Sequence, residues 1–234
     1  MNNESNFEIY LFIDKKKMII SAINKKTFKT IYLEQIFLEN NFDDKSLKKL
    51  DYFLEKNIFK IEKILKDFIK SIYIILDNTK LLSIQISSKK QNNGNSINLE
   101  TLSHPLNNLK DLCQSNFQDQ KIVHMIIEKY LVDEKKYNFL PENLKCNNFS
   151  LNLKFICLSK NFLADLEKTL KKYHITINKV LSANYIENFL DKKAANIFTT
   201  ASRIKSGYNS NEVLLVPKTL KNKGFFEKFF DFFS

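Results

Sequence analysis

The stretch KIVHMIIEKYLVDEKKYNFLPENLKCNNFSLNLKFICL, residues 121–158, decides the fold. It begins with a β-branched apolar run and ends with an alternating apolar segment, Leu151 to Leu158, so its two ends predict a buried strand and a strand with one face inward. Between them, Asp133 to Asn138 is dense in charge and Pro141-Glu142-Asn143 carries turn chemistry. The stretch therefore predicts neighbouring strands joined by a long surface connection.

Composition and charge narrow the class of protein. The 234 residues, 44% of them hydrophobic, are enough to bury a sizeable core in one domain or in two small ones. The formal charge of +11 raises nucleic acid or an anionic membrane surface as a partner. Arg203 is the single arginine, however, and the lysines are scattered among acidic neighbours, which disfavours a nucleic-acid-binding stripe.

Cysteine usage and hydropathy indicate a protein of the reducing cytoplasm. The three cysteines have irregular spacing without a CxxC pair, so neither a disulfide framework nor a zinc site is indicated. No run approaches the roughly 20 apolar residues that span a bilayer, and the first residues lack the pattern of a signal peptide.

Apolar periodicity predicts a mixed chain of class α+β or α/β. Before the central stretch we expect a hairpin, a third strand, an amphipathic helix interrupted near Asn57, and two more strands. These elements cover, in that order, 7–13, 18–23, 27–37, 43–70, 71–76 and 81–87. The polar segment 89–96 is expected to be a loop at the junction of two structural units, and a helix is expected only from Pro105 onward. After the central stretch we expect a helix at 161–173, a strand at 175–181, a short helix at 182–189 and a linker at 217–224.

The last residues, GFFEKFFDFFS, carry the sharpest local pattern. On a helix that advances about 100° per residue, six phenylalanines occupy one arc of roughly 160°. This stripe either docks onto the protein's own core or inserts at a membrane interface, and we favour the membrane because lysines precede it. The predicted membrane-binding residues are Phe225, Phe226, Phe229, Phe230, Phe232, Phe233, Lys221, Lys223 and Lys228.

Little in the sequence predicts catalysis. The histidines His104, His124 and His174 do not have metal-ligand spacing, and His124, inside an apolar run, is interpreted as a core residue. The chain holds only three glycines and neither a P-loop nor a GxGxxG motif. We therefore expect no catalytic residue, no cofactor and no metal.

The order of segments resembles the FtsA family, actin-like bacterial division proteins that tether the FtsZ ring to the membrane. Residues 121–158 are similar to the family's Val-His run and the motifs after it: Tyr130 and Asp133 stand at its tyrosine and aspartate, and Leu140-Pro141 near its Asn-Pro turn. Residues 9–23 resemble the first hairpin of the actin fold, and 161–185 resemble the family's helix, strand and Leu-Ala-Ser segment. The terminal amphipathic helix also belongs to the family pattern.

Two departures from the family matter for function. The family's first hairpin turn is a small-residue phosphate loop, whereas this chain has Asp14-Lys15-Lys16-Lys17, whose bulk would block the approach of a phosphate. We expect the family's second phosphate loop and second lobe to be missing, because residues 197–208 already resemble the family's final helix. The resemblance thus implies a shortened relative, for which the family's ATP binding and its usual FtsZ-binding subdomain are not carried over.

The resemblance implies a truncated actin-like (RNase H-like) lobe with an inserted subdomain of the SHS2 or 1C type and a C-terminal amphipathic helix. Its expected boundaries are 1–76 and 161–211 for the lobe, 77–160 for the insertion, 212–223 for a linker and 224–234 for the membrane-targeting helix. The expected function is a non-catalytic cell-division adaptor on the inner face of the cytoplasmic membrane. Its expected partners are lipid and other division proteins, with FtsZ or self-association through the insertion among them. The alternatives are an actin-like ATPase remnant, a pilus or secretion scaffold and, least favoured, a nucleic-acid-binding protein.

Overall fold

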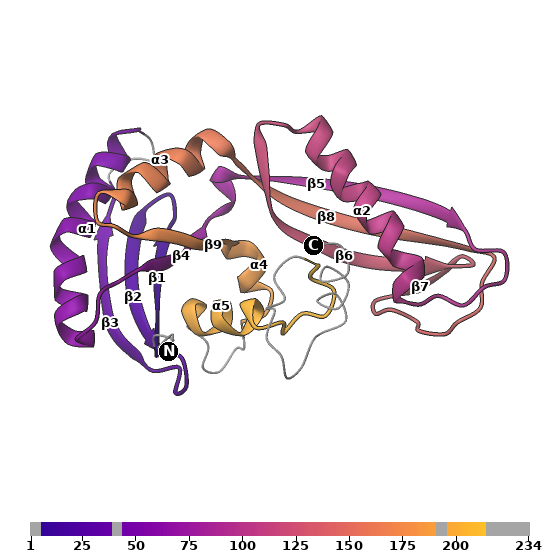
Figure 1. Ribbon diagram of the computed structural model, residues 1–234, viewed down its shortest axis with the longest axis horizontal. Helices are drawn as coiled ribbons and strands as arrows, with labels where there is room; N and C mark the ends of the chain where they lie inside the picture. Colours follow the sequence, from indigo (N-terminus) through magenta and orange to yellow (C-terminus); the bar gives the residue numbers. More distant parts are fainter. Residues whose placement is uncertain (1–5, 39–43, 191–195, 214–234) are drawn as a thin grey trace. The chain divides into compact units, whose positions relative to one another are not determined.

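The computed structural model describes residues 6–38, 44–190 and 196–213. The chain divides into two compact units, each with its own sheet (Figure 1). Unit 1 comprises residues 1–81 and 159–202, and unit 2 comprises residues 82–158 and 203–234. The expected mixed α/β class is therefore confirmed.

The sheet of unit 1 has five strands in the order β3-β2-β1-β4-β9. Antiparallel pairing joins β1 to β2 and β2 to β3, while β4 pairs parallel with β1 and β9 pairs parallel with β4. The three antiparallel strands need only short turns, whereas each parallel strand is reached through a helical crossover. The strands are β1 (Phe7–Ile13), β2 (Lys17–Asn24), β3 (Thr30–Phe37), β4 (Ser71–Leu76) and β9 (Thr176–Ser182).

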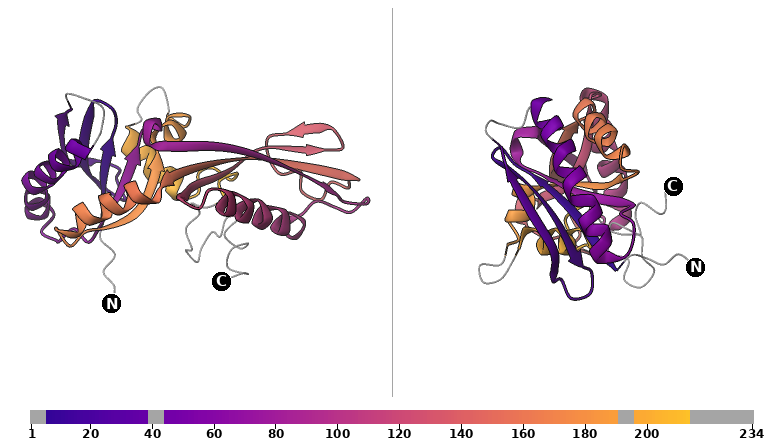
Figure 2. Two further views of the ribbon diagram at one scale, coloured as in Figure 1. Left: turned by 90° about the horizontal axis from the view of Figure 1, so that it is seen from above. Right: turned by 90° about the vertical axis from the view of Figure 1, so that its left-hand side faces the viewer.

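Helices cover both faces of this sheet (Figures 1 and 2). Helix α1 (Asp44–Leu65) packs beside α3 (Lys160–Lys171) on one face. On the other face, Phe198 of α5 (Ile197–Lys205) lies 5.8 Å from the Tyr10 ring of β1, measured between ring centroids. The remaining short elements are the 3-10 turn η1 (Asn78–Lys80) and α4 (Ala183–Glu187), which follows β9.

The expected interruption of the first helix near Asn57 is wrong, because α1 is continuous through that residue. The Asn57 side chain is buried, and its Nδ2 donates to the Phe53 carbonyl 2.7 Å away. Its Oδ1 accepts from the Tyr32 hydroxyl of β3 at 2.5 Å. Asparagine has a low helix propensity, but here both ends of its amide are paired within the fold, which removes the reason for a break.

Unit 2 packs one helix onto a four-stranded sheet of order β5-β8-β6-β7. Its elements are β5 (Leu81–Gln91), α2 (Leu99–Asn116), β6 (Gln120–Val132), β7 (Lys135–Tyr137) and β8 (Asn148–Ser159). Alternate residues of β8, from Phe149 to Cys157, point into one core with Leu102, Leu106 and Leu109 of α2. The expected neighbouring strands of the central stretch are thus confirmed as β6 and β8, with β7 in their connection.

Two boundaries differ from those expected. Lys89 and Lys90 belong to β5, and the division between the units falls at Leu81 rather than in the polar segment 89–96. Helix α2 begins at Leu99, so that Pro105 lies inside it. Asn98 explains the earlier start: its Oδ1 accepts from the Thr101 amide, and the Thr101 hydroxyl accepts from the Asn98 amide, both at 2.9 Å. This reciprocal cap stabilises the turns before the proline.

Candidate functional site

The predicted membrane-binding residues lie outside the described part of the chain. This holds for all nine of them: Phe225, Phe226, Phe229, Phe230, Phe232, Phe233, Lys221, Lys223 and Lys228. The described ranges end at Val213, and the last three described residues contact β6 within unit 2.

Residues 211–213, which we call the anchor segment, pair with the edge of β6. The Ile127 amide donates to the Asn211 carbonyl at 2.9 Å, and the Val213 amide donates to the Met125 carbonyl at 2.7 Å. Ile126 and Glu212 form the antiparallel bridge between these two bonds. Backbone pairing of this kind fixes the register of residues 211–213 against β6.

A buried side-chain contact locks the anchor segment in place. Glu212 is 1% exposed and His124 of β6 is fully buried, and the Glu212 Oε2 lies 3.2 Å from the His124 Nδ1. The other carboxylate oxygen, Oε1, accepts from the Met125 amide at 3.2 Å. A buried carboxylate is tolerated only where such partners replace water, so this contact ties the segment to one position on β6.

The interpretation of His124 as a core residue agrees with this burial, but Glu212 was not among the residues singled out from the sequence. Its partner lies 88 positions away, a separation at which no local pattern operates. The one available signal was the apolar run that begins at Val213 and continues to Val216, which is typical of a strand.

The turn between β1 and β2 is the place where the family resemblance implies a phosphate loop. Here the Asp14 Oδ1 accepts from the amides of Lys16 and Lys17, at 2.6 and 2.8 Å. The Asp14 amide in turn donates to the Lys17 carbonyl at 3.0 Å. A phosphate loop binds its ligand with free backbone N–H groups. In this turn two backbone N–H groups already donate hydrogen bonds to the carboxylate of Asp14.

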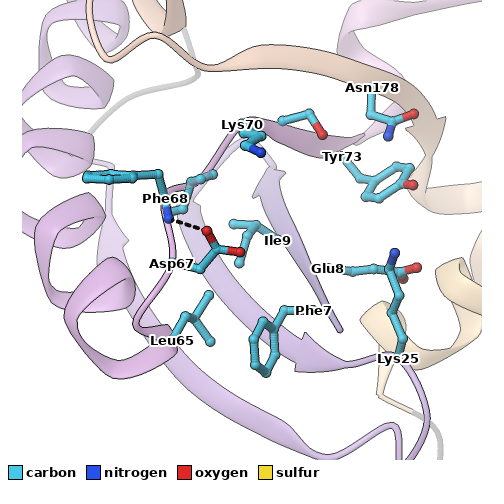
Figure 3. A pocket seen from close by; sticks show the side chains of 12 residues that line it. Phe7, Glu8, Ile9, Lys25, Leu65, Asp67, Phe68, Lys70, Tyr73 and Asn178 are labelled. Carbon is cyan, nitrogen blue, oxygen red and sulfur yellow. Dashed lines mark hydrogen bonds between the residues drawn. The ribbon is translucent and has the colours of Figure 1, made fainter. Parts of the chain in front are cut away.

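A small pocket of about 280 Å³ lies in unit 1, lined by residues of β1, β4, β9 and the loop after α1 (Figure 3). Its charged lining residues are two carboxylates, Glu8 and Asp67, and two lysines, Lys25 and Lys70. This mixture of signs gives no preference for an anion or a cation. The volume is at the lower limit of typical ligand pockets, which begin at about 300 Å³.

Glu8 in the pocket wall has a structural role. Its Oε2 accepts from the Tyr10 hydroxyl at 2.6 Å and from the Ser202 hydroxyl of α5 at 2.8 Å. Burial, and after it the neighbouring Glu8 carboxylate, raises the pKa of Tyr10 well above its usual value. The tyrosine therefore stays protonated and keeps donating to Glu8, which joins β1 to α5.

Among residues 6–38, 44–190 and 196–213, no cluster of three or more His, Cys, Asp or Glu side chains is arranged to hold a metal ion. None of the helices in these ranges is both long enough and apolar enough to cross a membrane.

No protein-family model matches the sequence, and no curated protein matches it. Among solved structures, the chain is similar to the cytoplasmic domain of EpsL, an inner membrane component of the type II secretion system of Vibrio cholerae. The identity is 10% and the TM-score 0.38, over 77% of this chain and 58% of that one. It is also similar to a chain of the PilM-PilN type IV pilus biogenesis complex, with 7% identity and a TM-score of 0.49. This match covers 78% of this chain and 49% of that one.

A third similar structure is a Bacteroides thetaiotaomicron protein described as having an actin-like ATPase fold and unknown function. The identity is 14% and the TM-score is 0.33, and the match covers 79% of this chain and 56% of that one. The chain thus spans between 49% and 58% of the length of these three solved chains.

Proposed function

We propose that this protein is a non-catalytic, membrane-associated adaptor of cell division that resembles FtsA. In this proposal unit 1 is an actin-like lobe, unit 2 is the inserted subdomain of the 1C type, and the C-terminal segment holds the protein on the inner face of the cytoplasmic membrane. The observation that carries the proposal is the phenylalanine stripe of residues 225–233 at the end of a chain whose last described residues are fixed on β6.

The anchor segment supports this arrangement because a membrane tether retains the protein at the bilayer only if it is firmly attached to a folded unit. Asn211 and Val213 bond to the β6 backbone, and Glu212 bonds to His124 and Met125 inside unit 2. Eleven residues, 214–224, separate that fixed point from Phe225. Fully extended, they span at most about 40 Å, so a lipid-bound tail would keep unit 2 near the bilayer.

The described elements support the two-part architecture. Unit 1 combines an antiparallel hairpin and third strand with parallel strands reached through helices. Unit 2 runs from strand β5 to helix α2 and then to further strands, the strand-helix-strand-strand order of the 1C-type insertion that the resemblance implies. It continues, however, into residues 203–213, which lie beyond the boundary expected for the insertion.

The first hairpin supports the non-catalytic part of the proposal. A phosphate would have to displace the Asp14 carboxylate from the amides of Lys16 and Lys17 and would meet its negative charge. The direct test is titration with fluorescent ATP in the presence of Mg²⁺. Absence of saturable binding up to millimolar concentration is the expected result, and tight Mg²⁺-dependent binding would overturn this part.

The tether is tested by sedimentation with vesicles that contain anionic lipid. Each phenylalanine that enters the headgroup boundary buries apolar area worth about 1 to 2 kcal/mol, so removing six should abolish most of the binding. The comparison is between the full chain and a chain that ends at Asn222. A full-length control carries the same last eleven residues in an order that breaks the stripe, and it should bind as weakly as the truncated chain. Equal sedimentation of all three would remove the tether from the proposal.

The cellular role requires a separate experiment. A fluorescent fusion is expected to gather at the division site, and chemical crosslinking there should recover division proteins. Accumulation with pilus or secretion components instead would replace the division role by the alternative scaffold role. That outcome would leave the membrane tether and the architecture intact.

A further inference from the structure

The outward surface of α1 carries large apolar side chains that are not packed into the core of unit 1. Phe59 is 71% exposed. Tyr52 and Ile64 are about half exposed on the same helix. A helix that covers a sheet normally presents polar residues to solvent, so a group of exposed apolar residues on one helix indicates a contact with something outside the fold.

The opposite side of α1 already supplies the core contacts that hold the helix to unit 1. Its buried residues are Leu50, Phe53, Leu54, Ile58 and Ile61. They recur at three- and four-residue intervals and cover the sheet on the face where Tyr32 meets Asn57. The exposed aromatic residues are therefore not needed to dock α1, and their presence on the outside has another cause.

Lysines alternate with these apolar residues on the helix surface. With 3.6 residues per turn, Tyr52, Lys56, Phe59, Lys60 and Lys63 fall within an arc of roughly 100°. We call these five residues, together with Ile64, the α1 outer face. The Lys56 Nζ lies 4.2 Å from the centroid of the Tyr52 ring, a cation–π contact that places charge and aromatic ring side by side.

The carboxylates near this face lie along one flank, and two of the three have partners within unit 1. The Asp51 Oδ2 is 2.6 Å from the Lys172 Nζ, and its Oδ1 accepts from the Tyr173 hydroxyl at 2.8 Å. The Glu62 Oε1 accepts from the Ile69 amide at 3.0 Å. The third, Glu55, is exposed. The arc itself, from Tyr52 to Lys63, therefore carries positive charge and apolar rings.

We propose that the α1 outer face is a second lipid-contacting surface, which lies against an anionic membrane. Lysine stems can extend along the rings while their ammonium groups meet lipid phosphates, and exposed phenylalanines can enter the headgroup boundary. The face is the convex side of a single helix, a shape that suits a fluid planar surface better than a preformed protein groove. The proposal concerns residues separate from the C-terminal stripe and stands whether or not that stripe binds lipid.

The test uses two full-length variants with the same change in composition. The variant F59S/K60E/K63E alters the α1 outer face. The control F139S/K135E/K136E alters unit 2, where Phe139 is 68% exposed and both lysines are exposed. On vesicles containing anionic lipid, the α1 variant is expected to bind at least about 100-fold more weakly than the control, because one phenylalanine and two lysines leave the contact. Equal affinity of the two variants would overturn the proposal.

A second measurement does not depend on affinity. The chain contains no tryptophan, so F59W and F139W each introduce a single fluorescent reporter. On anionic vesicles the emission of F59W should shift to shorter wavelength as the indole leaves water, and F139W should not shift. A shift of neither reporter, or a shift of F59W with a purified division protein and not with vesicles, would show that α1 does not contact lipid.

The same assay separates this inference from the C-terminal tether. The variant F226S/F230S disrupts the terminal stripe without touching α1. If the tether fails and the α1 inference holds, only the α1 variant loses affinity. If the α1 inference fails and the tether holds, only F226S/F230S loses affinity. Folding of every variant is checked by its thermal unfolding midpoint, which surface changes of this kind should move by a few degrees at most.

Discussion

Replacing Glu212 by alanine is expected to release the anchor segment from unit 2. The substitution removes the oxygen 3.2 Å from the His124 Nδ1 and the oxygen that accepts from the Met125 amide. Two hydrogen bonds to a buried carboxylate contribute about 1.5 kcal/mol each, so the expected loss in unfolding free energy is about 3 kcal/mol. E212Q keeps the size of the side chain and one carbonyl acceptor, and it should lose about 1 kcal/mol.

The measurement that fits this prediction is hydrogen exchange at two amides. The Ile127 and Val213 N–H groups donate across the junction between β6 and the anchor segment. A loss of about 3 kcal/mol in local stability should speed their exchange by about 100-fold, because each 1.4 kcal/mol is a factor of ten. The control E142A removes an exposed carboxylate of the same unit and should leave both rates unchanged. Protection within threefold of the wild type in E212A would show that Glu212 does not hold the segment.

Two further predictions follow from shifted ionisation. Hydrogen bonds from Lys172, and then from Tyr173, hold the pKa of Asp51 below its usual value. Because a folded-state pKa below the unfolded one stabilises the charged form, Asp51 should add stability above about pH 4 and lose it as pH falls through the lowered value. In D51N that part of the pH dependence should vanish from urea unfolding curves, and an NMR titration placing the Asp51 pKa at its ordinary value would contradict the assignment. Burial raises the pKa of Cys157 to about 12, and the adjacent Cys113 adds to the shift. At pH 8 the alkylation of Cys157 by iodoacetamide should therefore be at least about 100-fold slower in the folded protein than in the unfolded protein. Mass spectrometry would contradict this if Cys157 in native buffer reacted at the unfolded rate.

Local patterns predicted most of the elements, because each depends on neighbours within a few residues. The alternation from Leu151 to Cys157 corresponds to β8, and the three- and four-residue spacing from Leu50 to Ile61 corresponds to the buried face of α1. The errors arose where one local signal competed with another. Pro105 suggested a helix start, but the cap formed by Asn98 and Thr101 begins α2 earlier. Weighing the capping pattern above the proline would have found that boundary.

The candidate site was predictable to a smaller extent. A turn of the form Asp14-Lys15-Lys16-Lys17 already indicated an unfavourable phosphate loop. The fact that the Asp14 carboxylate accepts from the amides of that turn depends on its three-dimensional shape. The membrane-binding prediction for residues 221–233 stays a prediction, since it concerns residues outside the described ranges.

The sequence alone determined the strands and helices, the basic charge and the phenylalanine stripe, because period, composition and charge are properties of the chain itself. The tertiary structure decided which distant residues meet. Only folding brings Glu212 to His124 across 88 positions, since no short-range pattern encodes the partner of a buried carboxylate. Only the packing of α1 on its sheet shows that Phe59 is left in solvent while Ile58 and Ile61 are buried. The residue type alone does not say whether a hydrophobic side chain on a helix is buried, because the neighbouring element decides which side of the helix is covered.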